Sequence, residues 1–265
     1  MTVGDIAAKD VKALRDATGA GMMDAKRALV ECDGDFEAAS QMLREKGLAN
    51  AATRSDRENV EGAVALVSDG RRAALVHLKC ETAFSAKSDG FLSLVDELVN
   101  AVLTDGEAAV EACSTAIDDL RLTIKENVEV GRVSLIEAAE GNVLDTYLHV
   151  QDGRGVNGVV VEGSGVDQET LHQVALHIAF AKPTVLTREE VASDLVERER
   201  AALLEITKAE GKPEQAWDKI VEGRLTGWFR DTVLLEQGLH GDKTSVADVL
   251  NGGSIERFTQ AYLGA

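Results

Sequence analysis

The chain holds three cysteines and five histidines that could act as nucleophiles, bases or metal ligands, and their spacing argues against local chemistry. His77 and Cys80 are three apart in a predicted strand, so they point to opposite faces and form no local nucleophile–base pair. His172 and His177, five apart on a predicted helix, make a poor metal pair. We expect no cofactor or metal, although a thiol hydrolase pairing Cys80 with a distant histidine stays open.

A glycine-containing stretch, residues 18–26, superficially resembles a nucleotide-binding loop but lacks the residues and the preceding strand that such a loop requires. No predicted strand precedes it, and Asp24 occupies the third glycine position of a dinucleotide loop. Lys26 is not followed by Ser or Thr, as a phosphate loop requires. The stretch therefore predicts a sharp turn between two helices, with Met22 and Met23 opening the second. An exposed methionine is an adaptable contact surface, and at least one of the two is expected in the helical core.

One aromatic residue follows the end of a predicted strand in a polar stretch. Phe84 lies within Glu81–Lys87, where an exposed ring would be unusual unless it binds something. The alternative, which composition alone favours, is a loop phenylalanine folded back onto its own core. With no catalytic set in the sequence, a binding surface is the better interpretation.

The elements that would position these residues follow from the apolar spacing. Val11 and Leu14 predict a first helix, and Phe36, Ala39 and Leu43 predict a third that ends at Gly47. Three helices this short bury only a small core, so residues 1–47 form an appended helical domain, followed by a linker at 48–60.

The rest of the chain repeats a hairpin-plus-helix pattern. The two predicted hairpins turn at Asp69-Gly70-Arg71 and at Asp152-Gly153-Arg154, and each is followed by an amphipathic helix. This predicts an α+β fold with two related subdomains built on antiparallel sheets, at 61–140 and 141–265. The second includes a projecting helical hairpin at about 194–226 and a final strand, Ile255–Tyr262.

Composition and charge exclude several classes of function. The formal net charge of −18 argues against general binding to nucleic acid or a membrane surface, because phosphate would be repelled. The three widely spaced cysteines suit reduced thiols, and residues 1–6 show no signal-peptide pattern. We therefore expect a cytoplasmic location and a protein partner.

Several motifs carry a resemblance to a known family. They are Val11–Arg15 with Thr18–Asp24, Leu43-Arg44 with Lys46-Gly47, Cys80–Thr82 with Phe84, Glu126-Asn127, His177–Ala179 with Lys182-Pro183, Gly211–Glu214, Val221–Arg224 and Leu234–Gln237. The chain resembles elongation factor Ts, the guanine-nucleotide exchange factor of the GTPase elongation factor Tu, from about Val11 to Val249. The resemblance implies a UBA-like helical domain, two core subdomains and elongation factor Tu as partner, with a homodimer or heterotetramer among the possible assemblies.

The resemblance also implies partner-binding residues. Phe84 would wedge between two helices of the GTPase, flanked by Thr82 and Ala83. The turn that carries Met22 and Met23, here called the methionine turn, would face the nucleotide-binding domain of the partner. The other positions that match family contacts are Arg15, Lys26, Ile124 and His177. Without the family, these would be solvated cations, a core isoleucine and a satisfied helix histidine.

The chain also departs from the family pattern. Ala83 stands where the family has aspartate, Ser85 where it has an apolar residue, and Lys125 where it has glycine. Gly131-Arg132 replaces an Arg-Arg pair, and Gly238 replaces proline. These changes leave two alternatives to an exchange factor: a degenerate relative that binds or stabilises the GTPase without efficient exchange, and a helical binding module confined to residues 1–47.

Overall fold

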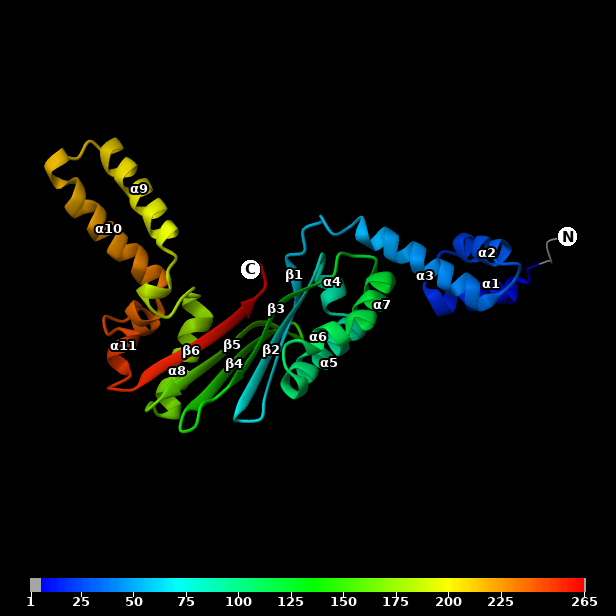
Figure 1. The fold of residues 1–265 in the computed structure, drawn as a ribbon, viewed down its shortest axis with the longest axis horizontal. Helices are drawn as coiled ribbons and strands as arrows, with labels where there is room; N and C mark the ends of the chain where they lie inside the picture. The colour runs from blue at the N-terminus through cyan, green and yellow to red at the C-terminus, as the bar shows by residue number, and fades with distance from the viewer. Residues whose placement is uncertain (1–5, 265) are drawn as a thin grey trace.

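The computed structural model describes residues 6–264, a mixture of helices and two small antiparallel sheets. This confirms the α+β prediction. Residues 1–5, on which most of the signal-peptide prediction rests, lie outside the described part of the chain, as does residue 265. Figure 1 shows an elongated molecule, with a helical domain at one end, a helical hairpin at the other and the sheets between them.

The N-terminal helices are α1 (Ala8–Thr18), α2 (Met22–Glu31) and α3 (Phe36–Ala52). Their core contains Val11, Leu14, Ala25, Ala28, Leu29, Ala39 and Leu43. The expectation that Met22 or Met23 fills this core is wrong, because they are 45% and 69% exposed. Met42 of α3 packs against the core instead, because it projects from the longest helix toward the other two.

The third helix does not end at Gly47, as predicted, and continues to Ala52. A side chain at position 47 would collide with Leu122 of α7 (Ser114–Ile124). The glycine therefore permits a close approach between α3 and α7 rather than ending a helix. Arg44 and Asp119 form an ion pair across the same contact, so part of the predicted linker is a rigid extension of α3.

The first sheet has the order β1-β2-β3, with β1 Glu61–Ser68, β2 Arg72–Cys80 and β3 Glu129–Glu137. The predicted turn is confirmed, since the Asp69 carboxylate accepts hydrogen bonds from the backbone N–H groups of Arg71 and Arg72. Four helices lie between β2 and β3 in the chain. They are α7 and, before it, α4 (Ala83–Ala86), α5 (Asp89–Asp105) and α6 (Ala109–Ala112). The core beneath α5 includes Phe91, Val95 and Leu98.

The second sheet repeats this plan with the order β4-β5-β6 and one covering helix, α8 (Gln168–Ala181). Its strands are β4 Val143–Gln151, β5 Arg154–Ser164 and β6 Ser254–Tyr262. Leu171, Val174 and Ile178 of α8 are buried against it, as the spacing predicts. The two hairpin-plus-helix units are thus confirmed.

The two sheets pack against each other through their other faces. Leu75 of β2 and Val160 of β5 are fully buried in a cluster that both sheets share. Alternate residues of β2 therefore serve two cores, because successive side chains point to opposite faces. In Figure 1 the helices α5–α7 and α8 lie on the outer sides of this pair of sheets.

The projecting hairpin consists of α9 (Ser193–Ala209) and α10 (Trp217–Thr232). Its tip contains Gly211 with φ 69°, followed by a short 3-10 turn at Glu214–Ala216. The second helix runs past residue 226, the predicted end of the hairpin, because Phe229 is buried at the base of the hairpin. Short helical turns at Arg188–Glu190, Leu234–Glu236 and Leu239–Gly241, with α11 (Val246–Val249), connect the hairpin to the second sheet.

Candidate protein-binding site

The phenylalanine singled out from the sequence is a protruding side chain. Phe84 is 88% exposed and sits on α4, a single helical turn that leaves the end of β2. The alternative of a ring folded back onto its own core is therefore wrong. An exposed aromatic ring on a short, well-fixed turn is an unsatisfied apolar surface that a partner can cover.

A half-buried carboxylate, that of Glu126, holds the turn that carries Phe84. One carboxylate oxygen of Glu126 accepts hydrogen bonds from the backbone N–H groups of Glu81 and Thr82, each at 3.1 Å. The other oxygen accepts from the hydroxyls of Thr82 and Ser85, at 2.7 and 2.6 Å. Thr82 also caps α4, because its hydroxyl accepts from the Ser85 N–H at 3.2 Å. The ring is thereby presented from a fixed base.

The flanking residues have separate roles in this turn. Thr82 is an anchor rather than a free contact, and Ser85, which replaces an apolar family residue, is buried and bonded to Glu126. Ala83 is half-buried and offers only a methyl group. Sequence reasoning noted Glu126 only as a family match, because its partners lie more than forty positions away in the chain.

Glu126 reaches this position through an unusual helix end. Lys125, the residue after α7, adopts the left-handed conformation with φ 58° and its N–H bonds to the Arg121 carbonyl. This reversal turns the chain back toward α4. Left-handed backbone favours glycine, which Lys125 replaces relative to the family pattern.

The nearby thiol is not a nucleophile. Cys80 is fully buried, and its Sγ lies 3.4 Å from the Thr82 carbonyl oxygen. Burial, with the nearby Glu126 carboxylate, raises the pKa of the Cys80 thiol to about 12. His77 lies on the opposite face of β2, in the space between the sheets. Because only a thiolate attacks efficiently, the structure gives the thiol hydrolase alternative no support.

The methionine turn forms a second exposed apolar feature. Met22 and Met23 begin α2 after the reversal at Gly19, where φ is 66°. Arg15 is exposed and paired with its neighbour Asp16, and Lys26 is exposed on α2. The structure therefore leaves all four side chains accessible, at the far end of the molecule from the hairpin (Figure 1).

Two predicted contact residues are interior. His177 is 2% exposed, its Nε2 is 2.9 Å from Gln237 Oε1, and its Nδ1 accepts the His240 N–H at 3.1 Å. Burial lowers the pKa of His177, so the ring is a neutral structural group. Ile124 is half-buried against the first core. Both match the alternatives given by the sequence, a satisfied histidine and a core isoleucine.

One exposed aromatic residue was missed. Phe180, three positions after His177, is 82% exposed. It falls outside the buried stripe of α8, Leu171, Val174, Ala175 and Ile178, and that departure from the helical period was the available signal.

Within residues 6–264, no group of three or more His, Cys, Asp or Glu side chains is arranged to hold a metal ion. In the same range, every helix is too short or too polar to cross a bilayer. The fold presents exposed apolar side chains on its helical domain and on both subdomains, among them Met23, Phe84 and Phe180.

Comparison with known proteins places the chain among translation elongation factors. The family model described as Elongation factor TS matches residues 81–265. The chain is 43% identical to Elongation factor Ts of Clavibacter michiganensis, covering 99% of this chain and 100% of that protein. It is 42% identical to Elongation factor Ts of Mycobacterium ulcerans, covering 99% of each. The chain belongs to the elongation factor Ts family.

Proposed function

We propose that this chain binds elongation factor Tu and accelerates the release of GDP from it, in the cytoplasm. The observation that supports this most is the 88% exposure of Phe84 on a turn fixed by Glu126. A protruding ring with a rigid base can enter a gap in a partner without first being ordered. Membership of the elongation factor Ts family supports elongation factor Tu as the partner.

Exchange of this kind involves no bond chemistry. A factor that binds the nucleotide-free GTPase more tightly than the loaded form must, by linkage, weaken nucleotide binding by the same factor. The ring must therefore make contacts that exist only after helices of the partner have shifted. The fixed turn supports such a role because a mobile ring would lose part of its binding energy on ordering.

One ring cannot supply the whole coupling. Burying a phenylalanine side chain is worth about 1.5–3 kcal/mol, or roughly one to two decades in an equilibrium constant. Met22 and Met23, exposed on a separate domain, would add contacts that hold the partner while the ring acts. We propose that four further positions help to shape the surface that contacts the partner. They are Thr82, Ala83, Ile124 and His177.

The test is release of labelled GDP from purified elongation factor Tu, with and without the chain. Phe84→Ala should lower the stimulated rate by about tenfold to a hundredfold, since the ring's burial is lost. Ile206→Ala, which shortens a 49% exposed apolar side chain on the hairpin, is the control and should change little. Equal rates for Phe84→Ala and the unmodified chain would refute the wedge.

Ala83 favours one competing function, a relative that binds the GTPase without efficient exchange. Its methyl group offers no hydrogen bond where the family has a carboxylate. Co-purification of the two proteins without faster GDP release would establish this alternative instead.

A further inference from the structure

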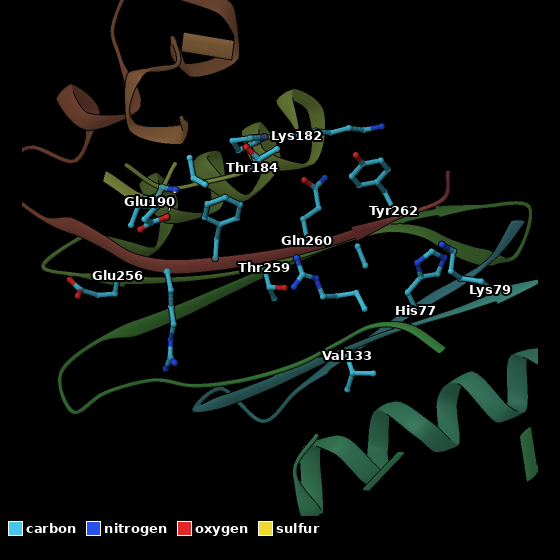
Figure 2. A pocket seen from close by; sticks show the side chains of 18 residues that line it. His77, Lys79, Val133, Lys182, Thr184, Glu190, Glu256, Thr259, Gln260 and Tyr262 are labelled. Carbon is cyan, nitrogen blue, oxygen red and sulfur yellow. Dashed lines mark hydrogen bonds between the residues drawn. The ribbon is translucent and has the colours of Figure 1, made fainter. Parts of the chain in front are cut away.

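A cleft between the two sheets lies apart from the proposed partner-binding residues. It has a volume of about 700 Å³ and opens where the sheets diverge, with walls from β2, β3, β6 and the segment after α8. On β2 the face toward the other sheet changes from Ala73 and Leu75, which are fully buried core residues, to His77 and Lys79. Figure 2 shows His77 and Lys79 on β2, with Thr259 on the face of β6 that is turned toward them, while Gln260 and Tyr262 extend from the opposite face of β6 toward Lys182.

Two buried polar atoms in this cleft lack partners. His77 is 3% exposed and Thr259 is 8% exposed, and His77 Nε2 and Thr259 Oγ1 make no hydrogen bond within the described residues. Thr259 is two positions before Ala261, which packs between the sheets, so both side chains lie on the same face of β6 and the Thr259 hydroxyl faces the cleft. A buried polar group without a partner costs about 1–3 kcal/mol. Both atoms are therefore available for a hydrogen bond to a small molecule bound in the cleft.

The cleft is cationic in a strongly acidic chain. Four cationic side chains line it, against the two carboxylates of Glu190 and Glu256, while the whole chain carries a formal charge of −18; the cations are Lys79, Arg132, Lys182 and Arg257. Arg257 is engaged by Glu162 at 2.7 Å, and Glu190 accepts the Leu186 N–H at 2.8 Å. Lys182 lies 3.9 Å above the ring of Tyr262.

One guanidinium in the cleft has no ionic partner. Arg132 is exposed and forms no ion pair or side-chain hydrogen bond with the described residues. It follows Gly131 in a β-bulge, where the pairing jumps from Val76–Val133 to Leu78–Val130, so both residues oppose His77. A side chain at Gly131 would approach His77 Nδ1 to 3.2 Å, so the glycine keeps the space beside the imidazole open.

We propose that this cleft binds a small phosphate-bearing anion. The guanidinium of Arg132 would balance its charge, and the Thr259 hydroxyl and the His77 ring would complete its hydrogen bonds. Burial and the charge of Lys79 lower the pKa of His77 to about 4, so at neutral pH the imidazole acts as a hydrogen-bonding group rather than a cation. The site is independent of the exchange proposal.

The test is a titration of the full chain, ¹⁵N-labelled, with inorganic phosphate at constant ionic strength, followed by two-dimensional NMR. We expect saturable shifts at the amides around His77, Arg132 and Thr259. Arg132→Gln should weaken binding by about tenfold or more, because a charge-assisted hydrogen bond is lost. Lys219→Gln, which removes an exposed positive charge on α10, should leave binding unchanged.

A parallel titration with glycerol 3-phosphate separates free phosphate from a phosphate ester as the natural source. Tighter binding of the ester would identify an esterified ligand, and tighter binding of phosphate would identify the free ion. Shifts that chloride reproduces, shifts scattered over the surface, or equal affinity in Arg132→Gln would overturn the proposal. GDP release from elongation factor Tu need not change in any of these variants, so the two proposals fail separately.

Discussion

At the scale of single residues, the Glu126 carboxylate fixes the turn that carries Phe84. Glu126 receives four hydrogen bonds from the segment that carries Phe84. Its side chain converts a short turn, which would otherwise fray, into a fixed mount for an exposed ring. The position of the ring thus depends on a residue of another element.

We predict that Glu126→Gln slows stimulated GDP release by about tenfold, since replacing charge-assisted bonds costs about 1.5–3 kcal/mol and an amide presents N–H groups to N–H donors. Glu129→Gln, a matched change on the exposed part of β3, serves as control. Release rates and circular dichroism together separate loss of the mount from unfolding. An unchanged rate with an unchanged spectrum would remove Glu126 from the account.

Ala83 gives a prediction of the opposite sign. Ala83→Asp places a carboxylate beside the ring, where the family has one, and should speed GDP release by up to about tenfold, in line with one hydrogen bond worth about 0.5–1.5 kcal/mol. The same GDP-release assay measures it, with Ala83→Asn as the uncharged control. If the aspartate variant is no faster, the aspartate is dispensable here.

At the scale of elements, helix ends and close approaches decide where the site lies. α7 ends at a left-handed lysine that delivers Glu126, and α3 runs on to Ala52 because Gly47 lets it approach α7. These two features link the helical domain, the first sheet and the Phe84 turn into one connected region.

We predict that Lys125→Gly raises the stability of the chain. A non-glycine residue in the left-handed region costs about 1 kcal/mol, and the substitution relieves this cost because glycine adopts that backbone conformation without strain. Urea unfolding measures the change, with Lys219→Gly in the middle of α10 as a control of opposite sign. A loss of stability in Lys125→Gly would show that the lysine side chain matters more than its backbone.

At the scale of the whole molecule, two packed sheets carry a helical domain at one end and a hairpin at the other (Figure 1). The space between the sheets is apolar where Leu75 meets Val160 and polar where His77 lines the cleft. Protonation of His77 would therefore act at the contact between the two subdomains.

We predict that stability falls as the pH drops below about 6.5. Burial lowers the pKa of His77 to about 4, so the unfolded chain binds a proton at a higher pH than the folded chain does. His77 should therefore contribute a loss of about 2 kcal/mol between pH 7 and pH 5. The difference in urea-unfolding free energy between the unmodified chain and His77→Gln isolates this contribution, and parallel pH profiles for the two would contradict it.

The sequence predicted much of the fold because the relevant signals are local. The two Asp-Gly-Arg turns follow from local turn residues, and the apolar stripe of α8 follows from a period of 3.6 residues. Prediction from the sequence failed for the end of α3 at Gly47 and for the burial of Met22 or Met23. Both depend on which surface a neighbouring element covers. A glycine ends a helix or admits a neighbour, and only packing distinguishes the two.

By itself, the sequence determined the α+β class and the repeated hairpin unit and singled out Phe84 as a candidate contact residue, since type and spacing along the chain are enough for these. Only the tertiary structure decided that the ring points outward, that Glu126 holds it, that His177 is interior and that a cationic cleft lies between the sheets. Each of these depends on groups distant in sequence meeting in space, and burial and hydrogen bonding are properties of that meeting.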